Sequence, residues 1–262
     1  MRILACVKRV PAPGARIKVA DDGQAVETAH LGFTTSPHEE CAVEAAVQLV
    51  EANEGTVTVL TLGPSEAEEQ LRYAASVGAN EIALVSVGDD DPLEGWDPQR
   101  TSKALADAIN SLEQQGGPFD LILFGNESAD SGGYQVGVRV AHQIGRPMIN
   151  GAKAIEIDDD QVVVRRAVDN GFEVFRLPSP CVVGVKEGIN LPRYPTMKGR
   201  LASKKVALST IDAEADAGGQ VMLHLSPPEE TESDTQILGQ HAGSVEEMAV
   251  EVVDLLEEIG LL

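Results

Sequence analysis

The sequence predicts an α/β fold whose core is a parallel sheet covered by helices. Short runs of aliphatic and β-branched residues alternate with amphipathic helical patterns through the first two-thirds of the chain. The helical patterns span roughly 12 to 15 residues, which is long enough for the crossovers that join parallel strands. Hydrophobic residues make up 43% of the 262 residues and charged residues 24%, an ordinary composition for a chain that buries a core.

The elements of this alternating region follow one another in a fixed order. The expected strands are 3–7, 56–62, 82–87 and 121–124, and the expected helices are 39–51, 65–77, 99–112 and 134–144. We expect Ser65 to cap the second helix and Gly78 to end it as the residue after its C-cap. A hairpin of 17–19 and 25–27, turning at Asp21-Asp22-Gly23, is expected to interrupt the pattern after the first strand.

The pattern changes after Lys153, where strand-like runs follow one another without helices between them. These strands are expected at 154–157, 161–168, 172–177 and 181–185. Because short turns join them, we expect them to extend the parallel core with antiparallel partners. The predicted α/β domain therefore covers residues 1–208.

Residues 209–262 are predicted to form an extended arm that ends in a helix. The arm is rich in small polar and acidic residues and lacks the large apolar residues that a core needs. Ser244 and Glu247 form a capping-box pattern, and apolar residues recur on one face of the helix that follows. This face must be buried either on the chain's own domain or on another chain, and the length of the arm favours the second.

Acidic residues outnumber basic residues by 42 to 20, which gives a net charge of −22. This charge repels phosphate backbones and anionic lipids, so we expect no nucleic-acid partner. The sequence has no apolar run of 18 residues and no secretory signal pattern, so we expect no membrane insertion and a cytoplasmic location. Of the basic residues 12 are Arg and only 8 are Lys, and such an acidic, lysine-poor surface suggests a halophilic host.

The cysteines and histidines do not predict a metal centre. Cys6, Cys41 and Cys181 lie far apart in the sequence, and the five histidines show no ligand spacing, so we expect neither a disulfide framework nor a metal site. The sequence also lacks a Walker loop and a nucleophile elbow. We therefore expect no catalytic residues of a self-contained enzyme.

Three loops follow expected strands or precede expected helices at the edge where parallel sheets bind ligands. They are 7–11, 36–40 and 125–137. The third loop is rich in glycine and leads into a helix, so its backbone N–H groups either hold a phosphate or simply form a turn. Lys8 and Arg9 either form a structural ion pair or face a ligand.

Several short motifs occur in the order typical of one family of electron carriers. They are Val7-Lys8-Arg9-Val10-Pro11, Ser36-Pro37 with Glu40 and Ala42-Val43-Glu44, Leu62-Gly63-Pro64, Asp130 with Gln135 and Gly137, Asp169-Asn170-Gly171, and Asn190 with Pro192-Arg193-Tyr194-Pro195. On these motifs the chain resembles the beta subunit of the electron transfer flavoproteins over nearly its full length. Each motif is weak alone, and their number and order make the resemblance specific.

The resemblance implies a core like that of the adenine nucleotide alpha hydrolases and a larger alpha subunit as partner, on which the arm and terminal helix of residues 209–262 would dock. The alpha subunit would hold most of an FAD, and this chain would hold AMP or, as in electron-bifurcating members, a second FAD. The residues carried over to the nucleotide site are Cys6, Ser36, Pro37, His38, Glu39, Leu62, Gly125, Asn126, Glu127, Ser128, Ala129, Asp130, Ser131, Gly132, Gly133, Tyr134, Gln135 and Val136.

The resemblance also implies a segment that docks on partner proteins. The matching residues are Asn190, Pro192, Arg193, Tyr194 and Met197, with Met197 at the position of an apolar anchor that is usually Leu. The implied role is that of an electron carrier subunit, not a stand-alone enzyme. It would take electrons from flavin dehydrogenases, such as the acyl-CoA dehydrogenases of fatty acid oxidation, towards a membrane quinone reductase.

Departures from the family pattern leave two questions open. Ser36 replaces the usual Asn, and the loop 131–134 lacks the further acids or Thr that many members carry, so both AMP and a second FAD are open as the bound nucleotide. Ala167 stands where some members have a Glu that biases domain motion, so that switch is expected to be absent or altered. The alternative function is an adenine-nucleotide-binding regulator or an ATP-using enzyme of the same superfamily. The run 130–133 is similar to the Ser-Gly-Gly loop of ATP pyrophosphatases, but it follows the fourth expected strand instead of the first.

Overall fold

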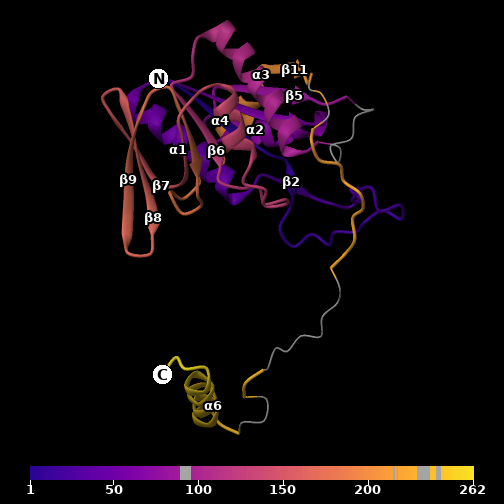
Figure 1. Ribbon diagram of the computed structural model, residues 1–262, viewed down its shortest axis with the longest axis vertical. Coiled ribbons are helices and arrows are strands. Elements are labelled where there is room, and N and C mark those ends of the chain that lie inside the picture. The colour runs from indigo at the N-terminus through magenta and orange to yellow at the C-terminus, as the bar shows by residue number, and fades with distance from the viewer. Residues whose placement is uncertain (89–95, 215, 217, 229–236, 240–242) are drawn as a thin grey trace. The chain divides into compact units, whose positions relative to one another are not determined.

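The computed structural model describes residues 1–88, 96–214, 216, 218–228, 237–239 and 243–262. They form two units, Met1–Leu225 and Ser226–Leu262, of which the first contains the sheet and the second the terminal helix (Figure 1). The first unit confirms the predicted α/β fold, with a large and mostly parallel sheet between two layers of helices.

The sheet has nine strands in the order β11-β5-β4-β1-β6-β10-β7-β8-β9. The strands with only parallel neighbours are β1 (Arg2–Val7), β4 (Thr56–Gly63), β5 (Glu81–Ser86), β6 (Leu121–Gly125), β10 (Cys181–Val185) and β11 (Leu208–Asp212). The remaining strands are β7 (Met148–Asp158), β8 (Gln161–Val168) and β9 (Gly171–Pro178), which pair in antiparallel fashion. Two short strands, β2 (Val10–Pro11) and β3 (Phe33–Thr34), form a separate antiparallel pair.

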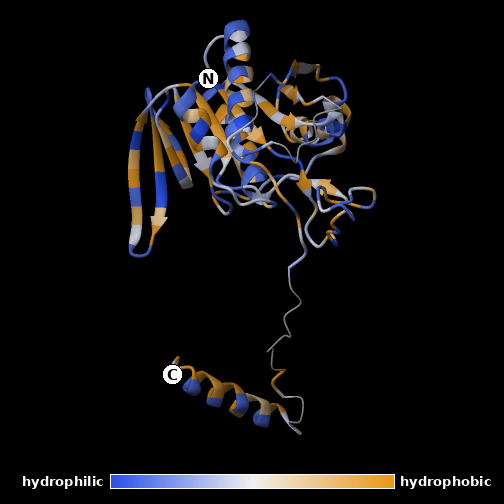
Figure 2. Cartoon of the chain, turned by 45° about the vertical axis from the view of Figure 1, so that its right-hand side comes forward, coloured by the Kyte–Doolittle hydropathy of each residue, from blue (hydrophilic) through white to orange (hydrophobic). Residues whose placement is uncertain are grey.

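Helices cover both faces of the parallel part of the sheet. On one face lie α1 (Pro37–Asn53) and α2 (Glu68–Ser76), and on the other lie α3 (Pro98–Gly116) and α4 (Val136–Gln143). Along β1, Ile3 and Ala5 join the first apolar cluster, whereas Leu4 and Cys6 join the second. Because both faces are buried, the central strands are continuously apolar, as Figure 2 shows.

The prediction for residues 181–185 is wrong in one respect. They were expected to pair in antiparallel fashion, but β10 lies between β6 and β7 and runs parallel to both. All five of its residues are buried, a pattern typical of a strand in a helix-covered parallel core rather than of a hairpin at an edge. The antiparallel extension predicted for the three preceding strands is confirmed.

Two predictions at turns also differ from the structure. Ser65 does not cap α2, because it is the first residue of a 3₁₀ turn, η1 (Ser65–Ala67), and the α-helix begins at Glu68. Gly78 does follow the helix, with a φ of 131° that favours glycine. The hairpin expected after β1 is reduced to a single bridge between Val19 and Val26.

The sequence analysis did not predict β11 or the short helix α5 (Met197–Ser203), which packs against α2. β11 pairs with β5, so the first unit continues beyond residue 208 as far as Leu225. Parts of the predicted arm, 229–236 and 240–242, lie outside the described residues.

The terminal helix α6 (Val245–Glu258) begins as its capping pattern predicts. The Ser244 hydroxyl accepts a hydrogen bond from the Glu247 N–H at 3.2 Å, while the Glu247 carboxylate accepts from the Gly243 N–H at 2.6 Å instead of from Ser244. Hydrophobic residues follow one side of this helix (Figure 2), and the apolar residues exposed on the helix include Val245 and Val252.

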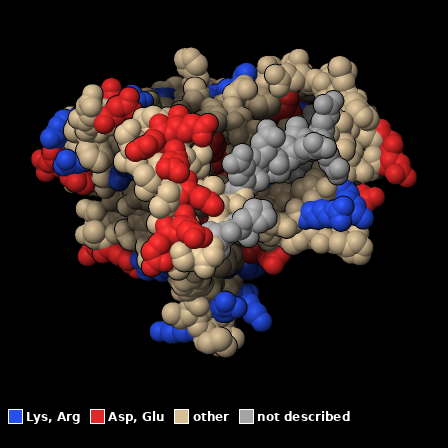
Figure 3. All heavy atoms as spheres, turned by 90° about the horizontal axis from the view of Figure 1, so that it is seen from below, with Lys and Arg blue, Asp and Glu red and all other residues tan. Residues whose placement is uncertain are grey.

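The surface carries the acidic excess of the sequence. Figure 3 shows several groups of Asp and Glu side chains, with Lys and Arg in smaller groups. Among the described residues, no helix is both long enough and apolar enough to span a bilayer.

Candidate functional site

The candidate site lies at the carboxyl ends of β1 and β6, near the middle of the sheet. From β1 the chain continues through α1 to β4 on one side, whereas β6 lies on the other side of β1. Strand order therefore reverses between β1 and β6, and ligands of open α/β sheets bind at such a switch point. The N-terminus of α1 and the loop 125–135 meet here.

The N-terminus of α1 is built around the buried carboxylate of Glu39. Its Oε2 atom accepts hydrogen bonds from the Lys8 N–H at 3.0 Å and the Ser36 N–H at 3.2 Å, so it joins the end of β1 to the start of the helix. Burial raises the pKa of Glu39 to about 7, although these two hydrogen bonds oppose the rise. The Ser36 hydroxyl is buried beside it.

His38, in the first turn of α1, connects two loops of the site. Its Nδ1 atom accepts a hydrogen bond from the Glu187 N–H at 2.8 Å, so the neutral ring carries its proton on Nε2. That nitrogen lies 3.1 Å from Oε1 of Glu127 and can donate to it. His38 thus ties the loop after β6 and the segment after β10 to the same helix.

The loop 125–135 is held by its own polar side chains and by Lys8. The Lys8 ammonium lies 2.7 Å from the Asp130 carboxylate, which also accepts from the Ser131 N–H at 2.7 Å. Burial alone would raise the pKa of Asp130, but the Lys8 charge and these hydrogen bonds bring it below its usual value. Lys8 was expected either to form a structural ion pair or to face a ligand, and in the structure it forms the ion pair with Asp130.

The end of this loop presents backbone N–H groups at the start of α4. Gln135, the N-cap residue, makes no side-chain cap, and the first turn has no acidic residue. The side-chain Oε1 atom of Gln135 instead accepts a hydrogen bond from the Arg139 guanidinium at 3.0 Å. Tyr134 has a φ of 56°, a conformation that costs a non-glycine residue about 1–3 kcal/mol. Uncapped N–H groups beside a strained turn suit an anion such as a phosphate.

The structure brings most of the predicted nucleotide residues together. Gly125 lets the loop lie against α1, because a Cβ there would be 2.6 Å from Cγ of Glu39. Residues 129–134 are exposed at the outer part of the loop. Cys6 and Leu62 belong to the apolar cluster beneath α3 and α4, where burial raises the pKa of the Cys6 thiol and keeps it protonated. Within the described residues, no group of three His, Cys, Asp or Glu side chains could hold a metal ion.

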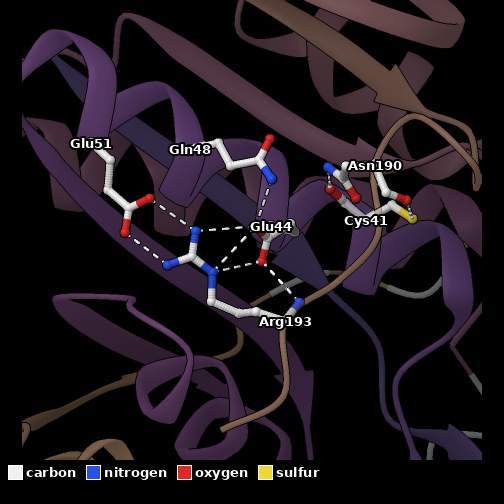
Figure 4. A network of polar contacts seen from close by, with 6 residues as sticks. All are labelled: Cys41, Glu44, Gln48, Glu51, Asn190 and Arg193. Atoms are coloured by element: carbon white, nitrogen blue, oxygen red, sulfur yellow. Dashed lines mark hydrogen bonds and ion pairs between the residues drawn. The ribbon is translucent and has the colours of Figure 1, made fainter. Parts of the chain in front are cut away.

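The predicted docking residues form a separate feature along the outer side of α1. Tyr194 is 90% exposed and Met197 76% exposed, and Met197 is the first residue of α5 rather than part of a loop. Asn190 is tied to α1 through its Nδ2 atom, which donates to the Cys41 carbonyl at 3.0 Å (Figure 4).

Sequence reasoning missed Glu44 and Glu51 of α1, which bind the guanidinium of Arg193 (Figure 4). The motif that includes Glu44 does not indicate a partner for it, and acidic residues on a helix are uninformative in so acidic a chain.

Comparison with known proteins gives one consistent result. The model of the electron transfer flavoprotein domain matches residues 25–216. The electron transfer flavoprotein subunit beta of Megasphaera elsdenii is 33% identical over 229 residues, covering 86% of this chain and 83% of that protein. The subunit beta of Mycobacterium leprae is 31% identical over 245 residues, covering 87% and 90%. The caffeyl-CoA reductase-Etf complex subunit CarD of Acetobacterium woodii is 32% identical over 200 residues, covering 76% and 73%.

Proposed function

Because the chain belongs to the electron transfer flavoprotein family and is similar to its beta subunits, we propose that it is the beta subunit of a heterodimeric electron carrier. Its partner would be an alpha subunit that holds most of an FAD. In this arrangement the chain supplies a nucleotide site, a scaffold and a docking surface, and it carries out no bond-making chemistry of its own.

The nucleotide site is the part of the proposal that the geometry supports best. The observation that carries it is that the N-terminus of α1, with the buried Ser36 hydroxyl, meets the loop 125–135 at the switch point. In the proposed complex this hydroxyl and the N–H groups at the start of α4 would hold AMP or a second FAD. A bound FAD would supply reversible one- and two-electron chemistry, whereas AMP would be structural.

The chain's own groups give this site its selectivity. The Lys8 ammonium is occupied by Asp130, so phosphate would be bound mainly by backbone N–H dipoles rather than by a free cation. The carboxylates of Glu39 and Glu127 are already held by hydrogen bonds from neighbouring N–H groups and from His38. These contacts would fix the start of α1 and the loop after β6 before the nucleotide binds.

The docking residues would bind flavin dehydrogenases such as acyl-CoA dehydrogenases, and the FAD of the heterodimer would carry the electrons from them to a membrane quinone reductase. The exposed side chains of Tyr194 and Met197 support this role, because a flexible thioether adapts to different apolar pockets. The similarity to a subunit of a caffeyl-CoA reductase-Etf complex supports an electron-bifurcating member as a second candidate. We propose a cytoplasmic location for the complex.

Ser36→Ala tests the nucleotide site, with Ser65→Ala at an exposed hydroxyl as control. Losing one hydrogen bond to the nucleotide should cost about 1 kcal/mol, which lowers affinity roughly five- to tenfold. Unchanged retention of AMP and FAD in Ser36→Ala would contradict the proposal, and retention of ATP by the parent chain would favour the ATP-using alternative.

Met197→Ala tests the docking role. It should slow electron transfer from an acyl-CoA dehydrogenase and leave nucleotide content unchanged, whereas Phe172→Ala, at an exposed side chain on β9, should have no effect. Equal transfer rates for Met197→Ala and the parent would refute this role.

A further inference from the structure

The segment 187–193 lies along one side of α1 and is attached to it at three successive points. The Glu187 N–H donates to His38 at 2.8 Å. The Asn190 amide donates to the Cys41 carbonyl at 3.0 Å, one turn further along the helix. The Arg193 N–H donates to Glu44 at 3.1 Å, a further turn along. The spacing of three residues between contacts keeps them on one face of the helix.

The last attachment is much the strongest, because Arg193 engages two carboxylates at once (Figure 4). Its Nε and Nη2 atoms donate to the two oxygens of Glu44 at 2.9 and 3.1 Å. Its Nη1 and Nη2 atoms donate to the two oxygens of Glu51 at 2.7 and 2.9 Å. The Glu44 side chain is only 4% exposed and also accepts from Gln48 at 2.7 Å. A planar guanidinium can make this double fork, and an ammonium cannot.

The two exposed docking residues, Tyr194 and Met197, follow immediately after these contacts of Arg193. Tyr194 and Met197 are mostly exposed, so contacts of their own side chains do little to fix them. The chain is next held in place at α5. The Thr196 hydroxyl caps this helix by accepting a hydrogen bond from the Gly199 N–H at 3.0 Å. Arg72 of α2 donates to the Ser203 carbonyl at 2.7 Å, which attaches α5 to α2. The docking residues therefore lie between an anchor on α1 and an anchor on α2.

We infer that Arg193 is a positioning residue, which orders the segment 194–197 before the partner dehydrogenase binds and so sets the affinity of docking. This inference rests on the proposed docking role. A preordered segment loses less conformational freedom on binding, so its anchor raises affinity without touching the partner. The contacts of Arg193 with Glu44 and Glu51 therefore affect how tightly the dehydrogenase binds, and they do not affect the rate of electron transfer within the bound complex.

The test uses the heterodimer purified with its alpha subunit and an acyl-CoA dehydrogenase with its acyl-CoA substrate as electron donor. Arg193→Lys keeps the positive charge beside Glu44 but loses the double fork. We expect KM for the heterodimer to rise about tenfold, equivalent to about 1.4 kcal/mol, with kcat and nucleotide content unchanged. Backbone amides of 190–197 should also exchange hydrogen faster. Arg176→Lys, at an exposed pair with Asp158, is the matched control and should change neither quantity.

A second variant guards against loss of folding. Glu44→Gln combined with Arg193→Gln removes the buried carboxylate together with its guanidinium partner. Glu51 also loses its partner but is 56% exposed, so no buried charge is left unpaired, and the variant should raise KM to a similar extent. Met197→Ala separates the inference from the proposed function. If Met197→Ala raises KM and both Arg193 variants leave it unchanged, the positioning role is refuted while docking stands. If Met197→Ala also leaves KM unchanged, the docking role itself fails and the inference fails with it.

Discussion

Replacing Glu39 by Gln should remove a specific pH dependence from the stability of the chain. Glu39 is the best buried carboxylate at the candidate site, with 6% of its surface exposed, and burial raises its pKa from 4.5 to about 7. A Gln side chain can accept the same two hydrogen bonds from Lys8 and Ser36 through one oxygen, because Oε2 accepts both in the parent chain. The substitution therefore removes the titration and keeps the local contacts.

The sign of the effect follows from proton binding. Below pH 4.5 the carboxyl group is protonated in the folded and the unfolded chain. Between pH 4.5 and 7 the unfolded chain releases this proton while the folded chain keeps it, so the free energy of unfolding falls as the pH rises. At about 1.4 kcal/mol per pH unit, the loss over this window is about 3 kcal/mol, and above pH 7 it is complete.

The assay is urea unfolding of the nucleotide-free chain at closely spaced pH values from 4.5 to 8. The difference in unfolding free energy between the parent and Glu39→Gln should fall by about 3 kcal/mol across this range, since other titrating groups cancel. Glu156→Gln, at an exposed carboxylate, serves as the control for the substitution itself. A parent-minus-variant difference that stays constant from pH 4.5 to 8 would refute the reasoning.

Three further predictions concern the loop, the terminal helix and the surface. Gly125→Ala should lower the free energy of unfolding by about 1–3 kcal/mol, because its Cβ would lie 2.6 Å from Cγ of Glu39. The Cβ of Gly88→Ala would meet nothing within 4 Å, so this control should leave the free energy of unfolding unchanged. Equal urea midpoints for the two variants would contradict this prediction. Deleting 244–262 should release the alpha subunit on a sizing column, because the exposed apolar side of α6 is the proposed contact, and an intact complex would count against it. Because a net charge of −22 repels itself in dilute buffer, thermal stability should rise on going to molar salt, and an unchanged melting temperature would refute the halophilic proposal.

The parallel core was predictable because its signals are local. Runs such as 56–62 and the helical stripe after Pro37 follow from hydrophobic periodicity and from turn residues nearby in the sequence. The same holds for the cap at Ser244, where the hydroxyl and the N–H that it accepts from are three residues apart. In these places the local pattern and the tertiary structure favour the same conformation.

The features that were missed depend on contacts between distant segments. The direction of β10 is set by its insertion between β6 and β7, and its apolar sequence fits either direction. The clamp of Arg193 on Glu44 joins residues 149 positions apart, and the ring of His38 meets Glu127 across 89 positions. Sequence motifs could suggest that these residues belong to functional loops, but not which side chains bind one another.

The measurement that tests the central claim most directly is a count of bound nucleotides. The chain is purified with its alpha partner in high salt, and FAD and AMP released from the heterodimer are quantified. The account predicts a stable heterodimer that holds FAD together with a nucleotide in this chain, either one FAD and one AMP or two FAD. A chain that binds ATP, carries no flavin and forms no complex with an alpha subunit would contradict it.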